Sequence, residues 1–305
     1  MRELFFVFIL FSGLTQTTKA QFDYILDIGG GLGAANFLGD IGGTSEKGAQ
    51  PFINDIQLTM TRVGFTAFGR YQFFDWLGVN AGYASVWVSG RDNLSKNPAR
   101  YTRNLSFSNH IHEIYARGEF YFLQLNDVGR YGRYRLDFKS FAYIGGAVFF
   151  HNPKTEYNGQ KVALQPLQTE GVAYGRIQPA IPAGLGIYFT LDRNHRFGFE
   201  VGGRYTFTDY IDDVSDTYPE VGWSDDPLAV ELSNRTDEVD PNDQLFLAGA
   251  QASPGGTRGG AEATDVYLMS FLTYSYVFRV KSNFSRSRYN FVTGKVKRRK
   301  SRAKF

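Results

Sequence analysis

The strongest constraint on the fold is a two-residue alternation of side-chain character that recurs along the chain. From Leu77 to Val88 the odd positions are mostly bulky and apolar, whereas the even positions begin with small or polar residues. From Phe197 to Thr208 the odd positions are largely aromatic, and the even positions include Glu200 and Arg204. Because successive side chains of a β-strand point to opposite faces, each segment predicts a strand with two unlike faces.

The same criterion gives eight candidate strands, at roughly residues 22–38, 57–74, 77–88, 106–123, 136–150, 177–191, 196–208 and 266–280. The first, third, fifth and seventh connections have 18, 17, 26 and 57 residues, and the others have 2, 12 and 4. Such alternation is typical of small bacterial outer-membrane barrels. The sequence therefore predicts an all-β protein, an eight-stranded antiparallel transmembrane outer-membrane β-barrel with long external loops.

The alternation alone does not say which face is inside, and a soluble lipocalin-like barrel or a β-sandwich would turn its apolar face inward. The loop asymmetry, the aromatic content of 16% and the N-terminal segment favour a membrane barrel. Arg2 precedes an apolar stretch from Leu4 to Leu14, and Thr18-Lys19-Ala20 is an acceptable cleavage site. We expect a signal peptide at 1–20, the barrel at 21–280 and a basic tail at 281–305. An even strand count then places both termini in the periplasm and the long loops outside the cell.

If the apolar face meets lipid, seven charged side chains collect in the lumen: Arg62, Arg70, Glu113, Arg117, Glu119, Glu200 and Arg204. An eight-stranded barrel is only wide enough to hold its own side chains. We therefore expect these residues to form a hydrogen-bonded plug, with no solute pore and no catalytic pair of glutamates.

Charge is segregated along the chain. Residues 281–305 carry ten Lys and Arg and no acid, while residues 209–265 carry fourteen Asp and Glu against Arg235 and Arg258. Candidate partner-binding residues in the tail are Lys295, Lys297, Arg298, Arg299, Lys300, Arg302 and Lys304. Behind a signal peptide we expect no nucleic-acid partner. The basic tail could instead bind an acidic periplasmic protein surface, anionic lipid headgroups or the cell wall. It could also serve only to keep the protein soluble.

Motifs for cofactors and metals are weak, and we expect neither. Gly29 and Gly31 match the start of a dinucleotide-binding turn, but Leu32 breaks the pattern and close strand packing explains the glycines. His110 and His112 share a strand face but lack a third ligand. The simpler interpretation is that they are polar residues near the external rim of the barrel. The acidic run 209–213 with 216 could bind Ca²⁺, although a solvated loop is the simpler interpretation. The chain has no Cys, which excludes disulfides and thiol chemistry.

Four stretches carry a more specific signal: residues 29–43 (GGGLGAANFLGDIGG), 103–114 (RNLSFSNHIHEI), 151–171 (HNPKTEYNGQKVALQPLQTEG) and 204–215 (RYTFTDYIDDVS). Together they resemble the PorG-like outer-membrane barrels of Bacteroidota, components of the type IX secretion system tied to gliding. The resemblance covers roughly residues 22–280. It implies a non-enzymatic barrel associated with a periplasmic ring of a PorK-like lipoprotein and a PorN-like protein. The acidic loop and the basic tail depart from that pattern.

We therefore expect a structural subunit of a secretion and gliding machine, whose partners are outer-membrane lipids and the ring proteins. One alternative is a stand-alone barrel acting as a solute channel or a surface-binding protein. Another is a membrane-embedded enzyme, which would need a catalytic cluster near the external rim involving Asp212, Asp213 and His110.

Overall fold

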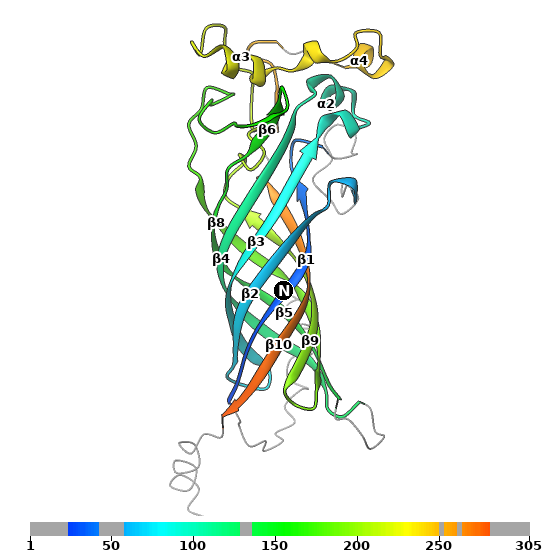
Figure 1. Ribbon diagram of the computed structural model, residues 1–305, viewed down its shortest axis with the longest axis vertical. Helices are drawn as coiled ribbons and strands as arrows, with labels where there is room; N and C mark the ends of the chain where they lie inside the picture. The colour runs from blue at the N-terminus through cyan, green and yellow to red at the C-terminus, as the bar shows by residue number, and fades with distance from the viewer. Residues whose placement is uncertain (1–23, 43–57, 129–135, 250–252, 261–263, 281–305) are drawn as a thin grey trace, which may run out of the picture. The chain divides into compact units, whose positions relative to one another are not determined.

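Long strands dominate the computed structural model, which describes residues 24–42, 58–128, 136–249, 253–260 and 264–280 (Figure 1). Eight of these strands make the barrel: β1 (Tyr24–Leu38), β2 (Arg62–Gln72), β3 (Leu77–Arg91), β4 (Ser106–Leu125), β5 (Leu136–Phe150), β8 (Ile177–Leu191), β9 (His195–Thr206) and β10 (Val266–Val280). Each has at least the 9–11 residues that a tilted strand needs to cross a bilayer.

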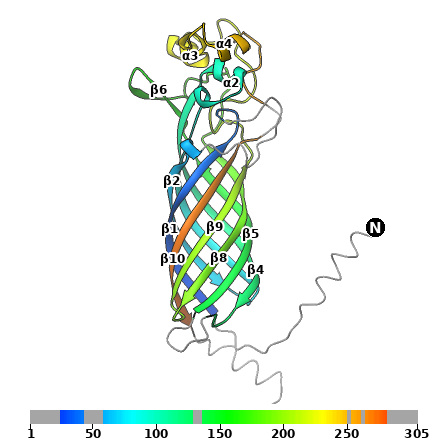
Figure 2. The same ribbon diagram turned by 90° about the vertical axis from the view of Figure 1, so that its right-hand side faces the viewer.

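The barrel closes on itself. Going round it, the strand order is β1, β2, β3, β4, β5, β8, β9 and β10, and β10 then pairs with β1. The pairs β1–β2, β2–β3, β3–β4, β4–β5, β5–β8, β8–β9 and β9–β10 are antiparallel. Figure 2 shows the strands tilted around a common axis. This confirms the prediction of an eight-stranded antiparallel barrel.

The apolar faces point outward. Leu32, Ile114, Ile144, Leu185 and Leu272 lie on five different strands, and their exposed fractions range from 56% to 74%. On β9, the even-numbered Glu200 and Arg204 are 4% and 2% exposed, whereas their odd-numbered neighbours are largely exposed. This arrangement suits a barrel surrounded by lipid and excludes the soluble interpretation, in which the apolar face would line the interior.

Exposed aromatic residues ring the barrel near both ends of the strands. Phe74 stacks on Trp76 near the short turns, with ring centroids 5.7 Å apart. Near the long loops, Trp87 stacks on His110 at 4.0 Å. Two such girdles, separated by aliphatic side chains, are typical of barrels that sit in a bilayer. No helix among the described residues is long and apolar enough to cross a membrane.

The structure changes several of the predicted strand boundaries and adds one hairpin. β2 ends at Gln72, before the predicted 74, and β3 and β4 extend to Arg91 and Leu125, beyond the predicted 88 and 123. Leu58–Met60 form the 3₁₀ helix η2, where Met60 packs on the outer wall and accepts a hydrogen bond from Ser89. β9 ends at Thr206 because the chain then turns into the barrel mouth. The connection 151–176 adds a hairpin of β6 (Lys154–Tyr157) and β7 (Gln160–Ala163).

In the described parts of the long connections lie three short α-helices: α2 (Pro98–Arg103), α3 (Pro227–Ser233) and α4 (Gln244–Ala248). Each begins after an Asn or Asp whose side chain accepts a hydrogen bond from a backbone N–H of the first turn, the usual N-cap. Two short 3₁₀ turns, η3 (Asp92–Leu94) and η4 (Thr236–Glu238), complete these loops.

The glycines of β1 allow it to pack closely on β10. A Cβ atom at Gly29 would overlap the carbonyl oxygen of Tyr274 and the side chain of Ser275, and one at Gly33 would overlap the carbonyl of Ser270. Gly29 therefore serves strand contact in a narrow barrel, in agreement with the packing interpretation of the glycine run. No βαβ unit is present among the described residues, so the nucleotide interpretation has no structural context.

Candidate functional site

A chain of buried ion pairs crosses the middle of the barrel. Arg196 Nη1 lies 3.0 Å from Asp27 Oδ1, and the other Asp27 oxygen is 3.1 Å from Arg70 Nη1. Arg70 Nε in turn lies 2.7 Å from Glu119 Oε2. The chain continues through Arg117 Nη2, which is 3.5 Å from Glu119 and 2.5 Å from Glu200. We call these residues, with the Arg204–Glu113 pair described next, the lumen network.

The Arg204–Glu113 pair lies nearer to the long loops. Arg204 Nε donates to both oxygens of Glu113, at 3.1 and 3.2 Å, and Tyr267 OH donates to Glu113 Oε2 at 2.7 Å. Four arginines thus face four carboxylates, so the formal charges cancel. Because a lone buried charge is costly, this balance is what permits an ionic interior.

Neutral side chains complete the packing around the ions. Asn80 and Tyr121 both donate to Glu119, at 2.8 and 2.7 Å. The guanidinium of Arg117 lies 4.0 Å from the ring centroid of Tyr143, and that of Arg196 lies 4.0 Å from Tyr188. Together with Asp27, Arg70 and Ser275, these residues come from all eight barrel strands. The middle of the lumen is therefore filled by side chains.

The structure brings six of the seven predicted lumen residues into this network: Arg70, Glu113, Arg117, Glu119, Glu200 and Arg204. Arg62 is the exception, because it lies at the start of β2 and its Nη1 donates to the carbonyls of Thr59 and Thr61, both at 3.2 Å. Two members were missed, Asp27 and Arg196. Both have the inward parity of their strands, so the alternation in 24–38 and 195–206 contained the signal.

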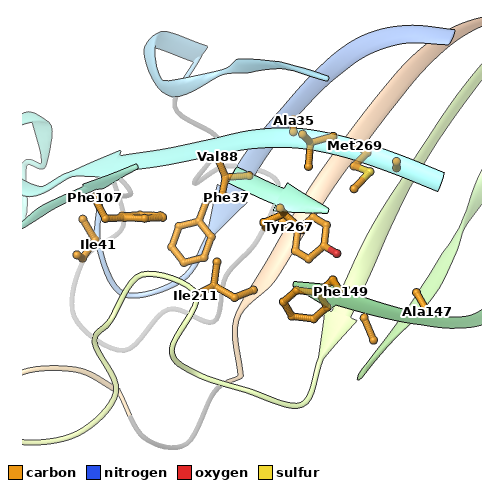
Figure 3. Packing of buried hydrophobic residues seen from close by; sticks show 14 of the residues in the cluster. Ala35, Phe37, Ile41, Val88, Phe107, Ala147, Phe149, Ile211, Tyr267 and Met269 are labelled. Carbon is orange, nitrogen blue, oxygen red and sulfur yellow. The ribbon is translucent and has the colours of Figure 1, made fainter. Parts of the chain in front are cut away.

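Apolar side chains close the barrel mouth next to the long loops. Ile211 and Val214, from the long connection after β9, are fully buried. Figure 3 shows Ile211 among Phe37, Phe107 and Tyr267 at this end of the lumen. The segment Asp209–Ser215 therefore acts as a stopper, and we call it the mouth plug.

The carboxylates of the mouth plug are buried, which corrects the interpretation of this acidic run as a solvated loop. Asp212 accepts hydrogen bonds from the backbone N–H groups of Ile41 and Val214, at 2.8 and 3.1 Å. Asp213 accepts from the hydroxyls of Thr169 and Tyr174, both at 2.5 Å. They are buried because they satisfy donors that the folded loops would otherwise leave unpaired.

Burial also changes the acidity of this region. Desolvation raises the pKa of Asp209 to about 8, and the nearby carboxylates of Asp40 and Glu170 add to that effect. Desolvation raises the pKa of Asp213 to about 6, although Arg258 opposes it. The pKa values of Asp212 and Asp265 rise for the same reason. Asp209 therefore keeps its proton at neutral pH, which lowers the negative charge of the cluster.

Two buried arginines tie the long loops together. Arg103 forms a two-pronged contact with Asp92, at 2.7 and 3.0 Å, and also donates to the carbonyls of Asp40 and Arg258. Arg258 donates to Glu170 at 2.9 Å and to the carbonyl of Asp213 at 2.8 Å. We call the described loop residues 39–42, 92–105, 151–176, 207–249, 253–260 and 264–265 the cap.

The four stretches singled out in the sequence meet in the cap. Ile41 binds Asp212, which joins the first stretch to the fourth. Asn109 donates to the carbonyl of Ile211 at 2.7 Å and accepts from the N–H of Asn152 at 2.9 Å, so the second stretch joins the fourth and the third. Segments far apart in sequence thus form one hydrogen-bonded unit over the barrel mouth.

The residues considered for metal or catalytic chemistry do not assemble into a site. His110 and His112 face outward on β4, where they contact Ser85 Oγ at 2.7 Å and Tyr83 OH at 2.6 Å. Asp212 and Asp213 are buried in the mouth plug, and no group of three or more metal-binding side chains occurs among the described residues. The seven basic tail residues lie outside the described residues.

The closed ring, the apolar outer face and the filled lumen define an eight-stranded β-barrel of the outer-membrane type. The chain belongs to the family described as a domain of unknown function (DUF6089), whose model matches residues 2–221. No curated protein matches it.

Two solved outer-membrane structures are similar to this chain. OprG from Pseudomonas aeruginosa is 11% identical with a TM-score of 0.39, over 85% of this chain and 97% of that one. Ail from Yersinia pestis, in complex with the heparin analogue sucrose octasulfate, is 11% identical with a TM-score of 0.36, over 84% of this chain and 100% of that one.

Proposed function

We propose that this protein is a structural, non-conducting barrel of the outer membrane that serves as a subunit of the type IX secretion and gliding machinery. The observation that carries the structural role is the filled interior. The lumen network occupies the middle of the barrel, and Ile211 and Val214 close the mouth. A barrel built in this way contributes a stable body in the membrane rather than a path for solutes.

The secretion role rests on the resemblance of the four sequence stretches to PorG-like barrels. Three hydrogen bonds join these stretches in the cap, through Ile41, Asn109 and Asn152. Stretches that pack against each other are constrained together by folding, so we expect this group of proteins to share the part of the molecule that these four stretches form. We propose no catalytic activity for this protein.

The barrel topology supports the orientation that we propose. Ile25 pairs with Gln72 and Tyr276 pairs with His195, so the chain enters and leaves the barrel at the short-turn end. In outer-membrane barrels the short turns face the periplasm. We propose that residues 281–305 follow β10 into that compartment, where their positive charge meets the PorK-like and PorN-like ring proteins.

The test is co-purification. A tagged full-length copy is extracted from outer membranes in mild detergent, and the bound proteins are identified by mass spectrometry. Recovery of the ring lipoprotein and its partner supports the subunit role. Recovery of the folded barrel alone, at full yield, contradicts it and favours a stand-alone protein.

The tail is tested by two further variants. Deletion of 281–305 should release the ring proteins, and so should a variant in which Lys295, Lys297, Arg298, Arg299, Lys300, Arg302 and Lys304 are replaced by Gln. A tail of scrambled order that keeps its charge should retain them, because screened attraction depends on charge more than on sequence. Retention of the ring by the deletion variant would contradict the tail contact.

The channel alternative is tested by planar-bilayer conductance of the purified protein. We expect no steady ion current, since the charges of the lumen network are paired with each other. A stable unit conductance would overturn the non-conducting role. A surface-binding role remains compatible with the cap, which carries a cavity of about 430 Å³ beside Tyr218, Trp223 and Val230.

A further inference from the structure

A groove on the outer wall of the barrel lies outside the lumen network and is bordered by Asn152, Lys154 and Lys161 of the cap. It has a volume of about 550 Å³ and lies near the long-loop ends of β2, β3 and β4, beside the β6–β7 hairpin. Its aromatic lining includes Trp87, His110 and Phe150, and its cations are Arg62, Lys154 and Lys161.

The groove opens toward the surroundings of the barrel. Trp87 and Phe150 are 38% and 41% exposed, and Val63 beside them is 70% exposed. Trp87 pairs with His110 in the β3–β4 register, and their rings stack at 4.0 Å. His112 pairs with Phe150 on the next strand. The groove therefore sits within the aromatic girdle, at the level where a bilayer changes from headgroups to acyl chains.

The three cations have no carboxylate partner among the described residues. Arg62 donates to backbone carbonyls of η2 and its flank, and Lys154 and Lys161 form no ion pair within the described part of the chain. The acid nearest by register is Glu156, opposite Lys161 in the hairpin, and its side chain is exposed. The groove thus has a net positive charge that an anionic ligand would neutralise.

An apolar strip continues from the groove toward the middle of the barrel. Ile114, the next outward residue of β4 after His112, is 70% exposed, and its register partner Val148 is 52% exposed. Cations beside aromatic rings and above an aliphatic surface match a lipid, because the headgroup and the chains each meet a suitable surface. Arg and Lys side chains are also the usual partners of phosphate oxygens.

We propose that this groove binds the phosphate-bearing headgroup of a lipid in the leaflet on the cap side of the membrane. Lys154, Lys161 and Arg62 contact the phosphate, Trp87 and Phe150 pack against the headgroup, and the acyl chains lie over Ile114 and Val148. This inference rests on the membrane placement in the proposed function and is independent of the secretion role.

The experiment is native mass spectrometry of the full-length protein released from detergent, with two lipids of equal acyl composition. One is bisphosphorylated lipid A and the other is its dephosphorylated form. We expect the phosphorylated lipid to be retained about tenfold more, which corresponds to about 1.4 kcal/mol of binding free energy, because its phosphates can pair with the groove cations. Equal retention of both lipids would overturn the proposal.

Matched variants locate the site. Lys154→Gln with Lys161→Gln should lower retention of phosphorylated lipid A at least severalfold, whereas Arg91→Gln with Lys96→Gln removes the same charge from exposed cap-side positions that do not line the groove. Equal losses in the two variants would mean attraction by overall charge and contradict a built site. Heat-dependent gel mobility verifies that each variant is folded.

Different experimental outcomes would contradict the lipid assignment and the membrane placement. Displacement of the lipid by millimolar inorganic phosphate would show a free-anion site and overturn the lipid assignment. A protein that fractionates with the outer membrane but does not discriminate between the lipids contradicts this inference alone. A protein absent from that membrane contradicts the proposed function instead.

Discussion

Arg117 of β4 reaches across the lumen to Glu200 of β9, and the Nη2–Oε2 distance is 2.5 Å. These strands are not neighbours, because β5 and β8 separate them on one side of the barrel. Both side chains are at most 5% exposed. The pair therefore links two non-adjacent strands across the lumen. Each buried charge is compensated by the other, which lowers the cost of burying it.

We expect Glu200→Ala to destabilise the barrel by about 3–5 kcal/mol, because Arg117 would stay buried with only the longer contact to Glu119. The midpoint of heat-dependent gel mobility and urea unfolding measure the loss. Glu220→Ala, at an exposed loop position, should change neither.

The double variant Arg117→Leu with Glu200→Leu should recover much of that loss, because apolar side chains replace both charges together. If Glu200→Ala destabilises the barrel no more than Glu220→Ala does, the lumen network contributes little to stability.

Glycine contacts give a second prediction. Gly29→Ala should lower the yield of folded barrel, because the new Cβ would overlap the backbone of Tyr274 on β10. Gly69→Ala adds the same methyl group where nothing lies within 4 Å, and should fold normally. Folding into detergent or vesicles, followed by gel mobility, compares them. Equal yields would contradict the close approach of β1 to β10.

The mouth plug gives a third prediction. Ile211→Asp places a charge among Phe37, Phe107 and Tyr267, which should displace the segment at a cost of several kcal/mol. The cap should then be cleaved about tenfold faster in limited proteolysis, while the barrel strands remain protected. Val221→Asp, at a position that is 88% exposed, is the matched control. Unchanged cleavage of the Ile211 variant would mean that the plug does not hold the cap.

The cap should lose stability as the pH rises from about 4 to about 8. Burial raises the pKa of Asp209 to about 8 from an ordinary value of 3.8, so the folded cap keeps a proton that the unfolded chain releases in this range. The stabilisation is complete below the ordinary pKa and is lost as the pH passes through the folded value. The raised pKa of Asp213, about 6, adds to the loss between pH 4 and pH 6.

Hydrogen exchange of amides 209–215, corrected for the intrinsic pH dependence of exchange, measures this effect. We expect protection to fall about tenfold or more between pH 6 and pH 8, and Asp209→Asn to remove most of that fall because its amide does not titrate. An identical pH profile for the wild-type protein and the variant would contradict the assignment to Asp209.

The strands could be predicted from the sequence because the character of each side chain indicates which face of the sheet it occupies. Alternation over 77–88 and 197–208 depends only on local geometry, and the predicted boundaries of β5, β8 and β10 agree with the structure. The same parity would have placed Asp27 and Arg196 inside. Arg62 also has inward parity on β2, but it lies at the strand end, where backbone carbonyls of the preceding turn are the nearer partners.

The pairing of charges and the fate of the acidic loop were decided by tertiary structure. Arg117 and Glu200 are 83 residues apart, and Ile41 and Asp212 are 171 apart, so no local pattern relates them. The run 209–213 is polar in composition, yet it is buried because its carboxylates satisfy donors supplied by distant loops. The sequence by itself determined the strands, their two faces and the order of long and short connections. Only closure of the ring, which brings distant side chains into one narrow interior, decided which charges pair and which loop fills the mouth.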